Sequence, residues 1–148
     1  YFLYPESRGR LHAQSPDARV QPKIEANYLE SAADRDAMVR LMKTIRRVAS
    51  QPALQRVIVR ETRPGLEVAS DEALLDYARA TAQTCWHPAG TCRMGSGPDA
   101  VVDPALRVHG TEGLRVVDAS VMPMLVSSNT NIPTIMIAEK AAELIARG

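Results

Sequence analysis

The sequence changes character at Cys85. Before this residue, apolar side chains recur at three- and four-residue steps in residues 34–50 and 70–84, which places them on one face of a helix. After it, glycine and proline separate short apolar runs as far as Pro133. The first pattern predicts amphipathic helices, and the second predicts extended segments joined by tight turns. The chain is therefore expected to join a helical part to a part rich in loops.

Two further elements are expected in the first part. Residues 8–13 and 23–29 both alternate roughly between apolar and polar side chains, and a proline-containing stretch separates them. This pattern predicts two strands of an antiparallel sheet. Ser50 followed by Pro52 predicts a short helix to about Val57, with Ser50 as its N-cap.

The two remaining helices have their own start signals. Ser70, followed by two carboxylates, predicts an N-cap and a helix that runs to about Thr84. Pro133 predicts the first residue of the last helix. That helix is expected to be mostly buried, because apolar residues occupy most of its positions.

Composition excludes several classes of partner. Eighteen basic and seventeen acidic residues nearly cancel, and no basic stripe is available to neutralise a nucleic-acid backbone. No apolar run approaches the roughly 20 residues of a membrane span, and the first residues lack the order of a signal peptide. The two cysteines, Cys85 and Cys92, lack zinc-site spacing and are expected to be reduced thiols. The expected location is cytoplasmic, with peripheral attachment to a membrane as the alternative.

Three stretches carry glycine, proline, histidine and asparagine where a plain structural module would carry hydrophobes. They are residues 87–95, 116–123 and 128–134. His87 lies on a loop after a helix, where an imidazole can exchange protons near neutral pH; an ordinary capping histidine is the alternative. Asp118 follows an apolar run, and a carboxylate at a strand end often binds ligands; a turn or cap residue is the alternative.

Asn129 and Asn131 precede the last helix, whose first backbone donors and dipole favour negative charge. An asparagine N-cap would account for one of the two residues but not for both. A hydrolase would combine His87 and Asp118 with a nucleophile such as Ser120, Ser127 or Ser128. No Gly-x-Ser-x-Gly elbow is present, which argues against that class.

Taken in order, the three stretches resemble the carboxy-terminal signature of the glucose-methanol-choline oxidoreductases, and most closely that of the choline dehydrogenase-like branch. The similar segments also include residues 7–10, 27–29, 101–104, 106–110 and 113–123, and a final segment runs from Asn129 to Ile145. The resemblance covers most of the second half of the chain and parts of the first.

This resemblance implies a set of roles. His87 matches the histidine that acts as general base toward the substrate hydroxyl, and Asn129 matches the second active-site position. Asp118 and Ala119 match residues against the ribityl and pyrophosphate region of FAD. Asn129, Thr130 and Asn131 match the segment along the flavin ring, and no metal is implied. Removing the hydroxyl proton eases hydride loss from the carbinol carbon, and at neutral pH only the imidazole can take that proton.

One departure from the family pattern matters most. No Gly-x-Gly-x-x-Gly fingerprint joins a first strand to a helix, as a flavin-binding domain needs, and residues 95–100 match only a looser spacing that we interpret as a loop. In the family this fingerprint lies near the amino terminus. The chain is therefore expected to be a fragment that needs the remainder of the FAD-binding domain and binds FAD poorly or not at all alone.

The resemblance implies an α+β fold. Residues 1–84 would form part of the substrate domain, an antiparallel sheet backed by helices, and residues 85–148 would complete the FAD-binding α/β domain. The implied reaction oxidises a small primary alcohol to an aldehyde by hydride transfer to FAD. The alternative is a non-catalytic binding or structural module that retains the motifs. The particular alcohol, the electron acceptor and the oligomeric state do not follow from the sequence.

Overall fold

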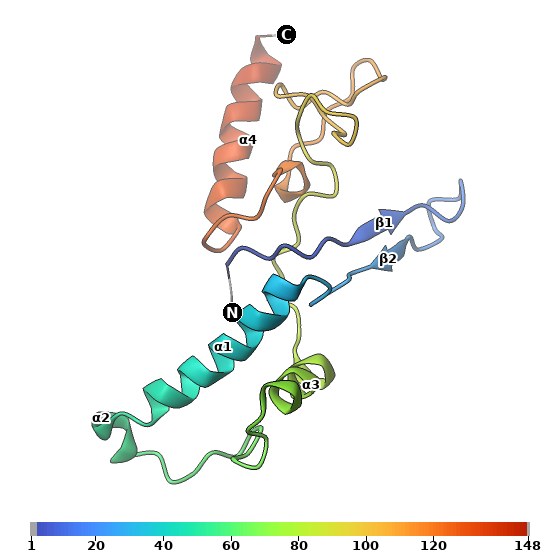
Figure 1. Ribbon diagram of the computed structural model, residues 1–148. Helices are drawn as coiled ribbons and strands as arrows, with labels where there is room; N and C mark the ends of the chain where they lie inside the picture. The colour runs from blue at the N-terminus through green and yellow to red at the C-terminus, as the bar shows by residue number, and fades with distance from the viewer. Residues whose placement is uncertain (1–2, 148) are drawn as a thin grey trace. The chain divides into compact units, whose positions relative to one another are not determined.

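The computed structural model describes residues 3–147, and within them it forms four α-helices, one 3-10 helix and a two-stranded sheet. In chain order the elements are β1 (Arg10–His12), β2 (Lys23–Glu25), α1 (Ala32–Ala49), α2 (Pro52–Gln55), α3 (Asp71–Thr81), the 3-10 helix η1 (Ala119–Val121) and α4 (Asn131–Ala146) (Figure 1). The expected mixture of helix and sheet is confirmed.

The chain divides into two compact units. The first unit is Lys23–Cys85 with the segment that ends at Arg10, and the second is Leu11–Pro22 with the segment that starts at Trp86.

The predicted strand pair is present but short. β1 and β2 form a two-stranded antiparallel sheet of three residues each. A Cβ atom on Gly9 would lie 2.7 Å from the carbonyl oxygen of Glu25, so only glycine allows this close backbone approach. Asn27 and Leu29 have φ angles of 50° and 60°, which ends the extended conformation soon after β2.

Polar groups fix the start of α1 in the first unit. The Ser31 hydroxyl accepts the backbone N–H of Asp34 at 3.0 Å, which makes Ser31 a true N-cap. The Asp34 carboxylate, only 2% exposed, accepts the backbone N–H groups of Glu6 at 2.9 Å and Ser7 at 2.8 Å. These bonds attach the segment before β1 to the first turn of α1.

The same bonds decide the ionisation of Asp34. Burial alone raises the pKa of this carboxyl group. The Ser7 side chain, the backbone N–H groups of Glu6 and Ser7, and the charge of Arg8 outweigh that effect, so the pKa lies below the usual value for aspartate. The carboxylate is therefore charged at neutral pH although it is buried.

At the C-terminal end of α1, the predicted role of Ser50 as an N-cap is wrong. Ser50 still has helical backbone angles and closes α1 as its C-cap, so it cannot be the N-cap of the next helix; Gln51 takes that position in α2. One turn earlier, the Arg46 guanidinium bonds the Glu61 carboxylate at 2.7 Å and the carbonyl oxygens of Gly65 and Val68. The Arg46 side chain, through its hydrogen bonds and its charge, holds the pKa of Glu61 below its usual range, against the opposing effect of burial.

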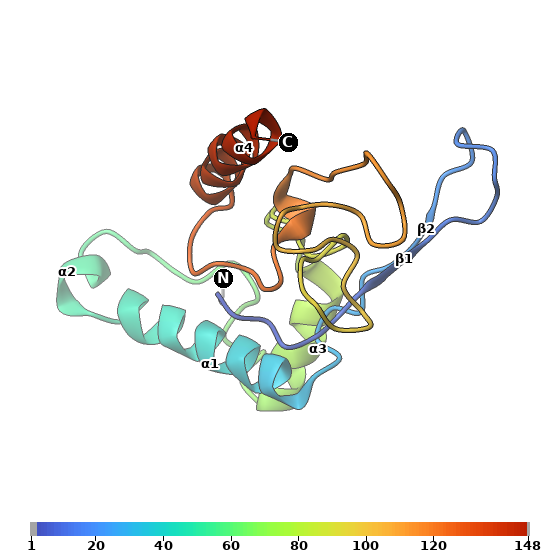
Figure 2. The same ribbon diagram turned by 90° about the horizontal axis from the view of Figure 1, so that it is seen from above.

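α3 packs beside α1, and both views show the two helices adjacent (Figures 1 and 2). Their apolar faces contain three buried residues, Val39, Leu74 and Ala78. Ser70 caps α3 as predicted, because its hydroxyl accepts the N–H of Ala73 at 3.1 Å. The helix ends at Thr81 rather than at Thr84, since the following residue has an extended backbone.

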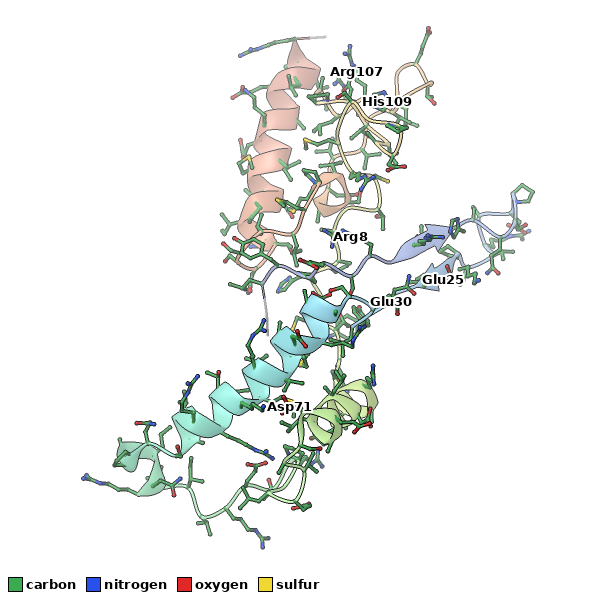
Figure 3. The ribbon with its side chains drawn as sticks, in the orientation of Figure 1. Arg8, Glu25, Glu30, Asp71, Arg107 and His109 are labelled. Atoms are coloured by element: carbon green, nitrogen blue, oxygen red, sulfur yellow. The ribbon has the colours of Figure 1, made fainter. Side chains whose placement is uncertain are left out.

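An apolar core joins the loops of the second unit to α4. Its buried members are Val102, Leu106, Val121, Met122, Ile137 and Ala141. The predicted extended segments meet only through isolated bridges, a parallel one between Met94 and Val102 and antiparallel ones further along. Turn side chains support these bridges, because His109 Nε2 lies 3.0 Å from the Gly95 carbonyl oxygen. Figure 3 labels His109 among the loops of this unit.

The prediction that the last helix is mostly buried is wrong. In α4 only Ile137 and Ala141 are buried, whereas Ile132 is 71% exposed. Figure 2 looks obliquely along this helix and shows the loops of the second unit on one side of it. The helix is apolar around most of its circumference, and the described residues cover one stripe of that surface.

Candidate active site

The loop that carries His87 is fixed by backbone bonds a few residues further on. The N–H of Cys92 donates to the Ser120 carbonyl at 3.0 Å, and the N–H of Met94 donates to the Val121 carbonyl at 2.9 Å. Gly90 turns the chain with a φ of 86°, and a Cβ there would lie 3.3 Å from the Met122 carbonyl oxygen. The loop thus lies against η1, as its glycine and its position after α3 allow.

His87 itself is half-buried, and its ring meets the start of α4. The Nδ1 atom of His87 lies 3.0 Å from the Thr130 hydroxyl oxygen. Thr130 is only 9% exposed, so this contact is shielded from bulk water. The predicted loop location of His87 is confirmed, and the imidazole is adjacent to the residue that follows Asn129.

The start of α4 differs from both sequence-based expectations. The helix begins at Asn131 rather than at Pro133, and its N-cap is Thr130 rather than an asparagine. Thr130 has helical angles, φ −78° and ψ −9°, and its side chain forms no capping hydrogen bond. The Thr130 side chain therefore does not cap the first turn of α4, where the positive end of the helix dipole favours an anionic group.

Asn129 and Asn131 flank Thr130 in the sequence, and both are exposed. The predicted stretch of three polar residues thus surrounds the contact with His87. Among the residues that the sequence singled out, the structure brings His87 and Thr130 into direct contact. Asn129 adjoins this pair along the chain, and its assignment as the second catalytic group stays a prediction.

Ala119 is the first residue of η1 and Asp118 is its N-cap, and η1 contacts α4. The Asp118 carboxylate caps η1 by accepting the N–H of Ser120 at 2.7 Å, so the alternative of a capping aspartate describes its local role. Ala119 is half-buried and packs against the apolar core of the second unit. A cofactor role for these two residues stays a prediction.

Two features were not visible in the sequence. One is the bond between His87 and Thr130, which joins residues 43 apart in the chain. The other is Trp86, which is 80% exposed and has a φ of 60°, a backbone conformation that is unusual for a bulky residue. Such strain is concentrated at functional sites, and this residue directly precedes the candidate base.

Between residues 3 and 147 there is no group of three or more histidine, cysteine, aspartate or glutamate side chains that could hold a metal ion. None of the helices in that range combines the length and the apolar character that crossing a bilayer requires. Cys85 and Cys92 are both free thiols.

The arrangement fits a flavin cofactor in chemical terms. A half-buried imidazole lies at the N-terminus of a helix whose N-cap residue forms no side-chain capping bond, and polar asparagines stand on either side of Thr130. Exposed apolar residues, Ile132 and Met136, follow in the first turns of α4. A flat aromatic group with a polar, electron-accepting edge matches such a mixture of apolar surface and positive helix end.

Comparison with known proteins agrees with this class of site. The family model for GMC oxidoreductases matches residues 5–138. The chain is 47% identical over 145 residues to the alcohol dehydrogenase [acceptor] of Pseudomonas putida, covering 98% of this chain and 26% of that protein. It is 48% identical over 141 residues to an oxygen-dependent choline dehydrogenase of Pectobacterium carotovorum, covering 95% of this chain and 25% of that protein.

Solved structures are similar as well. Pyridoxine 4-oxidase from Mesorbium loti superposes with a TM-score of 0.91 at 34% identity, covering 99% of this chain and 28% of that one. A fungal aryl-alcohol oxidase gives a TM-score of 0.83 at 35% identity, covering 98% of this chain and 24% of that one.

The fold and these matches therefore define the class of protein to which the chain belongs. The chain belongs to the GMC oxidoreductase family, whose members use FAD and act on alcohol or CH–OH donors. It spans about a quarter of the length of the relatives that it matches.

Proposed function

We propose that this chain supplies the catalytic residues of an enzyme that oxidises a primary alcohol, choline-like or other, to an aldehyde. The observation that carries the proposal is the contact between His87 and Thr130, because it brings the candidate base to the start of α4 beside Asn129. Relatives named for choline, for alcohols and for aryl alcohols support an alcohol as the substrate.

Each catalytic residue has a distinct task. His87 removes the proton of the substrate hydroxyl through Nε2, since Nδ1 is engaged with Thr130. Asn129 donates a hydrogen bond to the substrate oxygen and fixes its position for the transfer. When FAD is bound, it accepts the hydride that leaves the carbinol carbon. The alcohol thereby loses one proton to His87 and one hydride, which yields the aldehyde.

The proposed cofactor contacts follow from the same placement. Asn129, Thr130 and Asn131 would lie along the flavin ring, and Asp118 with Ala119 would face the ribityl and pyrophosphate region. The N-terminus of α4 would favour the negative charge of the reduced state. Residues 85–148 would complete the FAD-binding domain and residues 1–84 would belong to the substrate domain. The boundary between the two compact units, after Cys85, supports this division for most of the chain.

Replacing His87 tests the proposal directly. In the natural flavoprotein, His87→Ala should slow the anaerobic reduction of the flavin by alcohol about 100- to 10,000-fold, because proton removal no longer assists hydride loss. The rate is measured as bleaching of the flavin absorbance with choline, a short alkyl alcohol and benzyl alcohol as substrates.

His109→Ala is the matched control, since His109 is an exposed loop histidine of the same unit whose Nε2 lies beside a backbone carbonyl, that of Gly95. It should reduce the flavin at nearly the wild-type rate. Unchanged flavin reduction in His87→Ala would rule out the proposed base. No reduction of wild-type flavin by any of the three alcohols would favour the alternative of a non-catalytic module.

A further inference from the structure

Thr130 occupies a position at which a hydroxyl normally bonds its own helix. Threonine is a preferred N-cap residue because its side chain can accept an N–H of the first turn. Ser31 and Ser70 do so in α1 and α3, at 3.0 and 3.1 Å. Thr130 does not; its hydroxyl lies instead 3.0 Å from Nδ1 of His87.

The backbone of Thr130 holds this hydroxyl in place. Its carbonyl oxygen accepts both the N–H of Thr134 at 3.0 Å and the hydroxyl of Thr134 at 2.7 Å. Thr130 is almost completely buried, so few rotamers and little water compete for the contact. A buried hydroxyl diverted from its helix to an imidazole breaks a local rule, and such departures mark functional positions.

We propose that Thr130 is a positioning residue that sets the tautomer of His87. This inference rests on the proposed function, in which Nε2 of His87 takes the substrate proton. A neutral imidazole carries one proton, so Nε2 can accept only if Nδ1 is the protonated nitrogen. Nδ1–H then donates to the Thr130 hydroxyl oxygen, and the same bond persists after Nε2 is protonated, when both ring nitrogens donate. Thr130 thus stabilises both the neutral tautomer of His87 that acts as base and the imidazolium that forms when Nε2 takes the proton.

Three variants of the natural flavoprotein separate this role from plain packing. Thr130→Val keeps the shape and removes the hydroxyl, Thr130→Ser keeps the hydroxyl, and Thr81→Val is the matched control. Thr81 also has a hydroxyl bonded at 2.7 Å, but to the carbonyl of Tyr77 within α3. Selective ¹⁵N labelling of histidine reports the tautomer of His87, and the loss of one signal pair in His87→Ala assigns it.

At about pH 8.5, above the range in which free imidazole titrates, His87 should show a protonated Nδ1 and a bare Nε2 in the wild type and in Thr130→Ser. Thr130→Val should show a mixture of both tautomers. In turnover with alcohol, kcat should fall about three- to tenfold and KM should change little, as loss of one neutral hydrogen bond implies. The rate of flavin reduction at saturating alcohol should fall by the same factor. Thr130→Ser and Thr81→Val should stay close to the wild type.

The outcomes distinguish this inference from the proposed function. A wild-type His87 protonated on Nε2, or an unchanged tautomer in Thr130→Val, overturns the role of Thr130. So does a further loss of rate when Thr130→Val is added to His87→Ala, because two residues that act through one imidazole should not add. If His87→Ala itself leaves flavin reduction intact, the proposed function fails, whereas the tautomer measurement still decides whether Thr130 orients the ring.

Discussion

Among the described residues, α1 and α4 are the two longest helices, and each is preceded by a residue with a hydroxyl group. Ser31 bonds the first turn of α1, and a buried carboxylate, Asp34, adds further bonds there. The Thr130 side chain forms no capping bond to the first turn of α4 and contacts His87 instead. The first helix is thus fixed by its own polar side chains. In contrast, α4 is held by the apolar packing of one stripe, and the Thr130 hydroxyl at its N-terminus contacts the candidate site.

The largest effect is expected at Asp34. Asp34→Ala leaves the N–H groups of Glu6 and Ser7 without their acceptor, which should cost about 2–3 kcal/mol of local stability. Hydrogen exchange in the natural protein should show faster exchange in residues 5–8 and in the first turn of α1. Exchange around Ile137 in α4 should be unchanged.

Asp36→Ala is the control for this variant, because Asp36 is an exposed aspartate on the same helix. It should change exchange in α1 very little. Equal effects of the two substitutions would mean that the buried carboxylate does not fix the start of the helix.

Acid should weaken the start of α1 before it weakens α4. The pKa of Asp34 is lower in the folded protein than in the unfolded chain, where it is near 4, so its ionised form stabilises the fold above that pH. This stabilisation is lost as the pH falls through the folded-state pKa. Protection of the first turn of α1 should therefore fall below about pH 4, earlier than protection around Ile137 and Ala141. Asp34→Asn should remove most of the difference, and an α1 that gains protection in acid would contradict the assignment.

A smaller effect is expected at the other end of α1. Arg46 forks across Glu61 and two backbone carbonyls, a geometry that the single ammonium of lysine cannot reproduce. Arg46→Lys should cost about 1–2 kcal/mol and speed hydrogen exchange in residues 61–68. Arg40→Lys, at an exposed position of the same helix, should have no measurable effect. If the two variants behave alike, the Arg46 hydrogen bonds do not stabilise residues 61–68.

The difference between the helices also explains what could be predicted from the sequence. The start of α3 was predicted within one residue because its signal, a hydroxyl followed by carboxylates and an apolar periodicity, is local. The start of α4 was not, because Thr130 is directed by a histidine 43 residues earlier. The exposure of α4 was missed for a related reason: an apolar pattern shows that a helix can be buried, but not which surfaces cover it.

The candidate site was predictable in part. His87, Asp118 and Asn129 could be selected as chemically useful residues on loops or at element ends. The contact that orients His87 depends on tertiary structure, because the bonds from Cys92 and Met94 to η1 fix its loop. Asp118 shows the converse: a residue selected as a ligand group has a local capping role that the sequence offered as its alternative.

The smallest and most selective test compares the caps themselves. Ser31→Ala and Ser70→Ala each remove a hydroxyl that accepts a first-turn N–H, so each should cost about 1 kcal/mol and increase hydrogen exchange at the N-terminus of its own helix. Thr130→Val should leave exchange in the first turn of α4 nearly unchanged, since no capping bond is lost there. If Thr130→Val instead frayed α4 as much as the serine variants fray α1 and α3, the hydroxyl would be acting as a cap in solution, and its contact with His87 would be secondary. The expected result is that only α1 and α3 fray, in the serine variants, and that the His87 tautomer changes in Thr130→Val. A hydroxyl at the N-cap would then stabilise the helix in one unit and orient a candidate catalytic residue in the other.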